Sequence, residues 1–304
     1  MKTKILYFIL LFFLVFSSVK AQSKINLFLK PSDSLNVARK NSVVISEAVI
    51  LSAAMVGLQS YWYSDYPQSK FHFINDNADW LQMDKLGHIY TSYQLGNFGR
   101  DALKWSGVSQ KNQLLFGSTI GFVFLSAVEV LDGHSSNWGA STGDIIANAA
   151  GTALFVSQEL LWKEQRITPK FSFHTTQYAS LRPEVLGGSF NEQLLKDYNG
   201  QTYWLSVNLH SFFKKSKIPQ WLNVAFGYGA EGMIYSRNNE NSPLFPKGTT
   251  FRQFYVSFDA DLTKIKTNSH LLKTIFSVVN IIKIPSPTLE INGNGAVEFY
   301  AFYF

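Results

Sequence analysis

The 304 residues are 46% hydrophobic and 15% aromatic but only 16% charged, against about 25% charged residues in a soluble domain, which excludes disorder and favours contact with lipid or a large apolar partner. Lys2, Lys4 and Lys20 lie in an N-terminal targeting segment without acids, so the formal charge of +6 falls to +3 beyond it (24 Lys and Arg minus 21 Asp and Glu), and no nucleic-acid partner is expected. The absence of cysteine excludes disulfides, thiolate metal sites, a cysteine nucleophile and a lipid-modified N-terminal cysteine.

Residues 1–21 have the pattern of a secretory signal peptide. A basic start is followed by an apolar run from Ile5 to Phe16, and small residues surround a cleavage point between Ala21 and Gln22. The apolar run is shorter than the ~20 residues that cross a bilayer. We therefore expect cleavage and export rather than a retained membrane anchor.

Residues 22–165 are predicted to form a four-helix, membrane-associated module. The first helix opens within Pro31–Asn41 and continues through the apolar run Val43–Leu58, where small residues allow close helix packing. The aromatic stretch Gln59–Trp80 is typical of a membrane interface, with a soluble aromatic core as the alternative. The other predicted helices are Asp84–Trp105, Gln113–Leu131 and Gly143–Trp162. The last two are equally consistent with buried helices of a bundle.

Residues 166–304 are predicted to form an antiparallel, β-rich domain that associates with the outer membrane. Apolar and polar residues alternate in four runs, which are Tyr203–Phe212, Leu222–Tyr235, Phe251–Leu262 and Leu289–Phe304. Ser269–Ile282 has helical spacing instead. The last run ends on an aromatic residue, as strands of outer-membrane barrels usually do, but four or five strands are too few for a complete barrel. The predicted fold class is therefore α+β.

A polar cluster is predicted where two helix faces meet. Asp84 and His88 are four residues apart and share one face, and Asp144 and Asn148 share another. Glu129 lies near the end of the preceding helix, within reach of the loop between them. If these faces converge, they assemble carboxylates, an amide and an imidazole. The complete predicted cluster consists of Asp84, Lys85, His88, Glu129, Asp132, Ser141, Asp144 and Asn148.

This cluster has three interpretations. An imidazole with carboxylates suits zinc or a similar ion, with His88, Glu129, His134 and Asp144 as candidate ligands, although the HxxxH and HExxH spacings are absent. General acid–base chemistry is the second, with Asp84, His88, Glu129 and Asp144 as catalytic candidates. The third, which the sequence favours, is a structural hydrogen-bond network that holds the helices together, with Asp144 capping its own helix. The sequence does not identify a cofactor.

The same residues carry a family resemblance over about residues 80–155. The segments are Asp84-Lys85-x-Gly87-His88, Glu129 with Asp132-Gly133, and Trp138-Gly139-x-Ser141-x-Gly143-Asp144-x-x-x-Asn148-x-x-Gly151. Together they resemble the DUF2279 family, described as predicted periplasmic lipoproteins or hypothetical envelope proteins. More distantly they resemble the VanZ-like membrane proteins, linked to teicoplanin resistance. The signal junction is similar to that of DUF2279 members from Bacteroidota.

Two departures limit what this resemblance implies. The chain has no lipidation cysteine, so the lipoprotein description does not carry over. The β-rich half is foreign to VanZ-like inner-membrane proteins, so neither that location nor a resistance role carries over. The resemblance implies an envelope protein and identifies a site without an activity.

The leading functional expectation is a non-enzymatic structural or accessory component of an outer-membrane assembly. The expected partners are outer-membrane lipid and another outer-membrane protein or complex. The alternative is an enzyme that modifies an envelope lipid or glycan with the Asp84, His88, Glu129 and Asp144 cluster, and a metal-binding module comes third. An enzyme requires the cluster to line an accessible cleft, whereas a scaffold buries it with its polar atoms satisfied.

Overall fold

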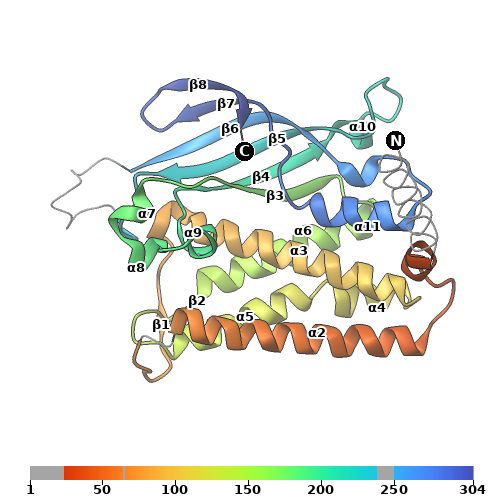
Figure 1. Ribbon diagram of the computed structural model, residues 1–304, viewed down its shortest axis with the longest axis horizontal. Coiled ribbons are helices and arrows are strands. Elements are labelled where there is room, and N and C mark those ends of the chain that lie inside the picture. Colours follow the sequence, from red (N-terminus) through yellow and green to blue (C-terminus); the bar gives the residue numbers. More distant parts are fainter. Residues whose placement is uncertain (1–23, 64–65, 238–249, 304) are drawn as a thin grey trace, which may run out of the picture.

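The computed structural model describes residues 24–63, 66–237 and 250–303. The predicted signal peptide and the terminal Phe304 lie outside these residues. Helices dominate the first half of the chain and an antiparallel sheet dominates the second (Figure 1). The predicted α+β class and the C-terminal antiparallel sheet are therefore confirmed.

Four long helices lie below the sheet in the view of Figure 1. They are α2 (Val37–Leu58), α3 (Met83–Trp105), α5 (Ile120–Gly133) and α6 (Thr142–Leu161). The short helix α4 (Gln110–Asn112) and a π-helical turn (Gln113–Gly117) precede α5, so the predicted third helix is interrupted near Gly117. Within the described ranges, Val37–Leu58 and Gln110–Gly133 are long and apolar enough to cross a membrane. That the four helices form a membrane module stays a prediction.

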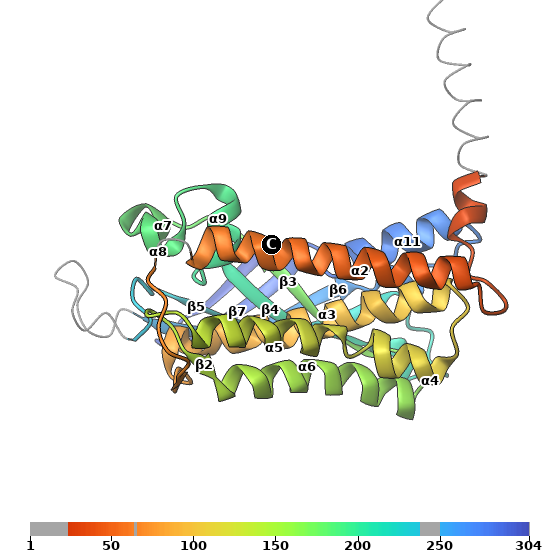
Figure 2. The ribbon, with the colours of Figure 1, turned by 90° about the horizontal axis from the view of Figure 1, so that it is seen from below.

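Helix α3 lies at the centre of the molecule. It contacts α2, α5, α6 and two strands of the sheet, and Figure 2 shows it among the long helices from below. Glycines set the close approach to the neighbouring helices. A Cβ atom on Gly121 of α5 would lie 2.3 Å from the backbone oxygen of Ser92, and one on Gly151 of α6 would lie 2.2 Å from that of Ile89. The small residues in these helices therefore fix the spacing of the faces that carry the polar cluster.

Six antiparallel strands form one sheet in sequence order. They are β3 (Ile167–Phe173), β4 (Gln201–Asn208), β5 (Leu222–Glu231), β6 (Phe251–Ala260), β7 (Ser286–Asn292) and β8 (Val297–Tyr303). The prediction of one strand over Leu289–Phe304 is wrong, because Gly295 has a φ of +84° and turns the chain into the β7–β8 hairpin. The sequence also missed β3, although its apolar and polar residues alternate, because Pro169 is rare in the interior of a strand.

Shorter elements connect the helices and the strands. They are β1 (Phe73–Ile74), β2 (Ala140–Ser141), α7 (Tyr178–Leu181), α8 (Pro183–Leu186), α9 (Phe190–Lys196), α10 (Leu209–Phe212) and α11 (His270–Val279). The predicted strand Tyr203–Phe212 therefore ends at Asn208 and continues as α10. Strands β1 and β2 pair in parallel, with Ile74 opposite Ser141. This pairing holds the chain before α3 against the chain before α6.

The sheet curls around a polar interior. On its inner face Lys170 Nζ lies 2.8 Å from Asp259 Oδ2, and both side chains are fully buried. Tyr303 of β8 lies across the curl within 3.2 Å of the Thr202 hydroxyl on β4. The segment leading into β7 then lies beside β3, because Phe171 N donates to Ile281 O at 3.0 Å. Contacts among the strands therefore close the inner face of the sheet. The face that meets the helices is the outer one.

The outer face of the sheet is apolar. Phe171 and Tyr203 on this face pack against Tyr90 of α3. Farther along the sheet the same face stays exposed, with relative accessibilities of 50% for Phe254 and 70% for Phe299. The exposed apolar set on the outer face is Leu205, Phe226, Phe254, Val256, Phe258, Leu289, Ile291, Val297 and Phe299. This arrangement of polar inside and apolar outside is the reverse of a soluble β-domain.

Candidate polar site between α3, α5 and α6

An unusual backbone turn positions the start of α3. Trp80, Leu81 and Gln82 have φ values of +48°, +50° and +66°, a left-handed conformation that non-glycine residues rarely adopt. The sheet holds this turn, because Tyr228 OH donates to Leu81 O at 2.6 Å and Arg252 donates to the Gln82 side chain at 2.7 Å. Strain of this kind persists only where surrounding contacts determine it, and it concentrates at functional sites. Asp84 follows directly in the first turn of α3.

The start of α6 is fixed by Ser141. Its hydroxyl caps the helix by accepting from Asp144 N at 3.2 Å and donates to Asp76 Oδ1 at 2.6 Å. Its backbone N donates to Glu129 Oε2 at 2.8 Å. The prediction that Asp144 caps this helix is therefore wrong. Because Ser141 takes the capping role, the Asp144 carboxylate is available to the cluster.

The two predicted helix faces meet. His88 Nδ1 on α3 lies 2.9 Å from Asn148 Oδ1 on α6. One turn farther along, Ser92 Oγ donates to the backbone oxygen of Asn148 at 2.7 Å and lies 2.9 Å from Thr152 Oγ1. Four-residue spacing on each helix thus produces the contact that the sequence predicts.

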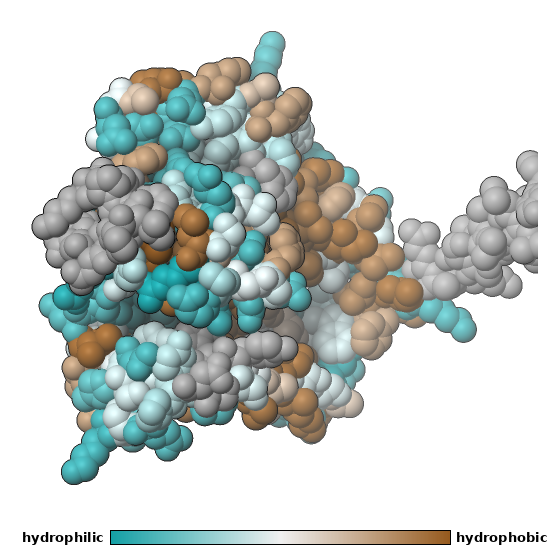
Figure 3. Space-filling model, turned by 60° about the vertical axis from the view of Figure 1, so that its left-hand side comes forward, coloured by the Kyte–Doolittle hydropathy of each residue, from teal (hydrophilic) through white to brown (hydrophobic). Residues whose placement is uncertain are grey.

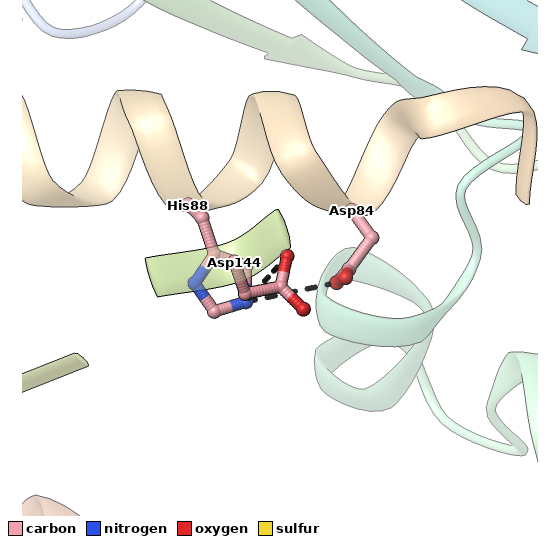
Figure 4. A group of neighbouring side chains, drawn as sticks. All are labelled: Asp84, His88 and Asp144. Atoms are coloured by element: carbon pink, nitrogen blue, oxygen red, sulfur yellow. Dashed lines mark ion pairs between the residues drawn. The ribbon is translucent and has the colours of Figure 1, made fainter. Parts of the chain in front are cut away.

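His88 Nε2 faces carboxylates on three helices. It lies 3.9 Å from Asp84 Oδ1, 3.8 Å from Glu129 Oε1 and 3.8 Å from Asp144 Oδ1. Figure 4 shows Asp84, His88 and Asp144 pointing toward one another, and their ligand atoms all lie within 4.8 Å of one another. The remaining members of the predicted cluster, Lys85 and Asp132, lie beside this centre.

Lys85 is the second cation of the cluster. Its Nζ lies 2.8 Å from Asp76, 2.8 Å from Asp144 and 3.2 Å from Asp84. The sequence did not identify Asp76, which reaches the site through the β1–β2 pairing. Asp132 accepts from Tyr63 OH at 2.7 Å. Five carboxylates therefore surround two cations, and the group carries a negative excess even when His88 is protonated.

Neighbouring charges shift the ionisation of this group. Burial opposes the charged form of Asp84, but His88 and Lys85 outweigh it and hold the pKa of that carboxyl below its usual range. Burial likewise opposes protonation of His88, but Asp84, Asp144 and Glu129 outweigh it and raise the pKa of the imidazole. Burial and the nearby Asp84 charge raise the pKa of Asp144 to about 7. Asp144 thus titrates near neutral pH, which suits an acid–base group, and the same neighbours favour the protonated form of His88.

A cavity of about 330 Å³ adjoins the cluster. Its polar end is formed by Asp84, His88 and Tyr198, and Tyr198 OH donates to Asp84 Oδ1 at 2.7 Å. Its other walls are largely apolar and aromatic, and they include Leu125, Leu194, Leu195, Phe171 and Tyr203. Leu195 is 59% exposed and marks the side where the cavity meets the surface. Tyr198 carries no spacing signal that links it to α3, so sequence reasoning missed it.

His134 does not belong to this centre. It is exposed at the end of α5, and its ring packs edge-on against Phe71 with 5.4 Å between centroids. Within the described residues the converging ligand set is Asp84, His88 and Asp144. The structure therefore does not bring His134 together with the other candidate ligands, because its ring lies at the end of α5 against Phe71.

Comparison with known proteins agrees with this geometry. Residues 72–159 match the family model DUF2279, described as a predicted periplasmic lipoprotein. The predicted resemblance to this family is therefore confirmed for this segment. The DUF2279 segment contains the β1–β2 pairing and all eight residues of the predicted cluster, whereas Tyr198 and the sheet lie outside it. No curated protein and no solved structure gives a significant match to the chain.

The family description supports an exported protein of the cell envelope. These 304 residues contain no cysteine to carry a lipid, so the lipoprotein part of the description finds no attachment residue in them. The more distant VanZ-like resemblance and the Bacteroidota type receive no support from the comparisons and stay predictions.

Proposed function

We propose that this protein is an enzyme of the cell envelope, with Asp84, His88, Glu129 and Asp144 at its centre. The observation that carries the proposal is that Asp84 and His88 line the 330 Å³ cavity. A purely structural network would be enclosed with its polar atoms satisfied, whereas this one faces a space large enough for part of a ligand. The cavity thus favours the enzymatic alternative over the scaffold that the sequence favoured.

The walls of the cavity indicate an amphipathic substrate. Charged and hydroxyl groups gather at one end, at Asp84, His88 and Tyr198. Leu125, Leu194 and Phe171 line the rest and suit a hydrocarbon chain. The substrate class that fits both ends is an envelope lipid or a lipid-linked glycan, with its headgroup at the cluster.

The chemistry that the cluster supports is acid–base-assisted hydrolysis of the headgroup. His88 is oriented through Asn148 and directs Nε2 toward the carboxylates, where it accepts a proton from water or returns one to a leaving group. Asp144, with a pKa of about 7, exchanges protons near neutral pH. Asp84, whose pKa is held low by His88 and Lys85, stabilises the imidazolium that forms during the transfer.

The outer surface supports a location at the outer membrane. The apolar outer face of the sheet is continuous along β5 to β8, and α2 exposes Val44, Ile45 and Ile50. In Figure 3 hydrophobic side chains gather along one side, while the end turned toward the viewer is mostly polar. Outer-membrane lipid is the partner that suits such a surface.

A structural role in an outer-membrane assembly is the second candidate. The observation that favours it is the same exposed outer face, which another outer-membrane protein would cover as well as lipid does. In that role the cluster would only hold α3, α5 and α6 together, and its substitution would affect stability alone.

The test compares turnover by matched variants. Wild type, Asp84→Asn, His88→Ala and Glu184→Gln are incubated in detergent with a total lipid extract of the envelope, and the lipids are followed by mass spectrometry. Glu184 is the control because its carboxylate is 68% exposed on α8, away from the cluster. We expect new lipid products with wild type and Glu184→Gln and none with the cluster variants. An unchanged lipid profile with folded wild type would contradict an enzymatic function.

A further inference from the structure

We propose that Asp84, His88 and Asp144 bind one divalent metal ion and that Glu129 supplies a further oxygen ligand. The inference rests on the proposed function insofar as the ion would act at the same site. With the ion on Nε2, the ion and not the free His88 imidazole would activate the water. Binding of this ion can be measured independently of lipid turnover.

The spacing of the candidate ligand atoms fits an ion with small adjustments. In a tetrahedral site with metal–ligand distances of 2.0–2.1 Å, neighbouring ligand atoms lie about 3.3–3.4 Å apart. His88 Nε2 lies 3.9 Å from Asp84 Oδ1 and 3.8 Å from Asp144 Oδ1, and the whole set lies within 4.8 Å. Rotations of the carboxylates bring these atoms to coordination distance without moving the helices.

A second observation points to a cation at this position. Glu129 is 2% exposed, and its Oε2 accepts from Ser141 N. Its Oε1 has no hydrogen-bond partner among the described residues and lies 3.8 Å from His88 Nε2. A buried carboxylate oxygen without a donor is costly in a native fold. A metal ion between Glu129 and His88 would satisfy it.

Hydrogen bonds from residues outside the ligand set also orient the ligands, as they do in metal sites. Asn148 Oδ1 accepts from His88 Nδ1, which leaves the Nε2 lone pair of a neutral imidazole directed toward the carboxylates. Ser141 N fixes Glu129, and Tyr198 OH fixes Asp84. Three of the four ligands are therefore oriented by a partner on a different element.

The ligand types and the charge define the class of ion. Five carboxyl groups, those of Asp76, Asp84, Glu129, Asp132 and Asp144, gather near Lys85 and His88, and a bound cation would favour their ionised forms. One imidazole with carboxylates suits Zn²⁺ or Mn²⁺, whereas Mg²⁺ and Ca²⁺ prefer oxygen ligands alone. Lys85 Nζ lies 3.2 Å from Asp84 Oδ2 and 2.8 Å from Asp144 Oδ1, so Asp84 Oδ1 remains for the ion and Asp144 Oδ1 would be shared between the ion and Lys85.

The experiment measures metal binding by the full chain in detergent after treatment with a chelator. Zn²⁺ and Mn²⁺ are titrated by calorimetry, and Co²⁺ is followed by its visible absorption. We expect one ion per chain and at least a tenfold loss of affinity in His88→Gln and Asp144→Asn. Glu129→Gln should lose less, and Glu184→Gln should bind like wild type. Circular dichroism verifies that each variant is folded, and Asp84→Asn replaces any variant that is not.

Two outcomes would overturn the inference. Folded wild type that takes up none of the three ions would show that protonated His88 itself supplies the positive charge. Equal affinity in wild type, His88→Gln and Asp144→Asn would place the ion elsewhere. Metal binding without lipid turnover would contradict the proposed function alone, and lipid turnover without metal binding would contradict the metal site alone.

Discussion

Nδ1 of His88 on α3 lies 2.9 Å from Oδ1 of Asn148 on α6, and this contact decides which ring nitrogen faces the carboxylates. Asn148 is fully buried, so this side of the imidazole is shielded from solvent. The contact depends on the close approach of α3 and α6, which Gly151 permits. Helix packing and the chemistry of the site are thus joined at one hydrogen bond.

Replacing Asn148 with Leu should therefore affect both stability and function. The substitution leaves the buried Nδ1–H without an acceptor, and we expect a cost of about 1–3 kcal/mol in the free energy of unfolding. It also frees the ring to turn, so lipid turnover should fall. Denaturant unfolding and the turnover assay check the two effects. Thr152→Ala on the same face is the control, because it removes a hydroxyl near Ser92 and does not touch His88. Full turnover in Asn148→Leu would contradict the positioning role.

The spacing of α3 and α6 gives a second prediction. A Cβ on Gly151 would lie 2.2 Å from the Ile89 backbone oxygen, so Gly151→Ala must push the helices apart. We expect destabilisation of about 1–3 kcal/mol. Gly57→Ala on α2 is the matched control, because nothing lies within 4 Å of its Cβ and alanine favours helix by about 1 kcal/mol. Equal unfolding temperatures for the two variants would show that the close approach does not constrain the fold.

Local periodicity explains why much of the helical part and of the cluster could be predicted. A four-residue step places Asp84 with His88 and Asp144 with Asn148 wherever the helix lies. Glu129 was included in the predicted cluster because it precedes the loop that leads into α6. Asp76 and Tyr198 reach the site through tertiary contacts, the first by the β1–β2 pairing and the second from the chain after α9. No spacing in the sequence records either contact.

The sheet shows a different limit. Alternation located β4, β5 and β6, but it cannot tell which face is buried. On β6, Tyr255 and Ser257 face the polar interior while Phe254 and Phe258 remain exposed, which only the curl of the sheet determines. The single run Leu289–Phe304 hid a hairpin, because alternation on both sides of Gly295 has the same apparent phase. The alternation of apolar and polar residues therefore could not predict how distant strands pair.

The apolar outer face predicts recovery with the outer-membrane fraction and resistance to a high-salt wash. Charges on a lipid-facing strand cost about 2–4 kcal/mol at the membrane centre. The double substitution Phe254→Lys with Phe299→Lys should therefore lower the membrane-bound fraction. Leu181→Lys with Phe190→Lys is the matched control, because it alters exposed apolar residues on α7 and α9 rather than on β6 and β8. Release of wild type by salt alone would show a peripheral or soluble protein instead.

The ionisation of Asp144 gives a pH dependence with a definite sign. Its pKa is 3.8 ordinarily and about 7 in the fold, so the folded state keeps a proton that the unfolded chain releases. This contribution to stability is complete below about pH 4 and is lost as the pH rises toward 7, by up to about 1.4 kcal/mol for each pKa unit. His88, whose pKa is also raised, acts in the same direction.

Asp144→Asn removes the titrating group, so its stability relative to wild type should rise between pH 4 and pH 7 and level off above that range. Denaturant unfolding across these pH values, with a chelator present so that no metal holds the carboxylate ionised, measures the difference. Glu184→Gln should follow wild type at every pH, because its carboxylate lies on the surface. A constant difference between wild type and Asp144→Asn would show that the Asp144 carboxylate is ionised throughout, with Lys85 rather than a proton as its partner.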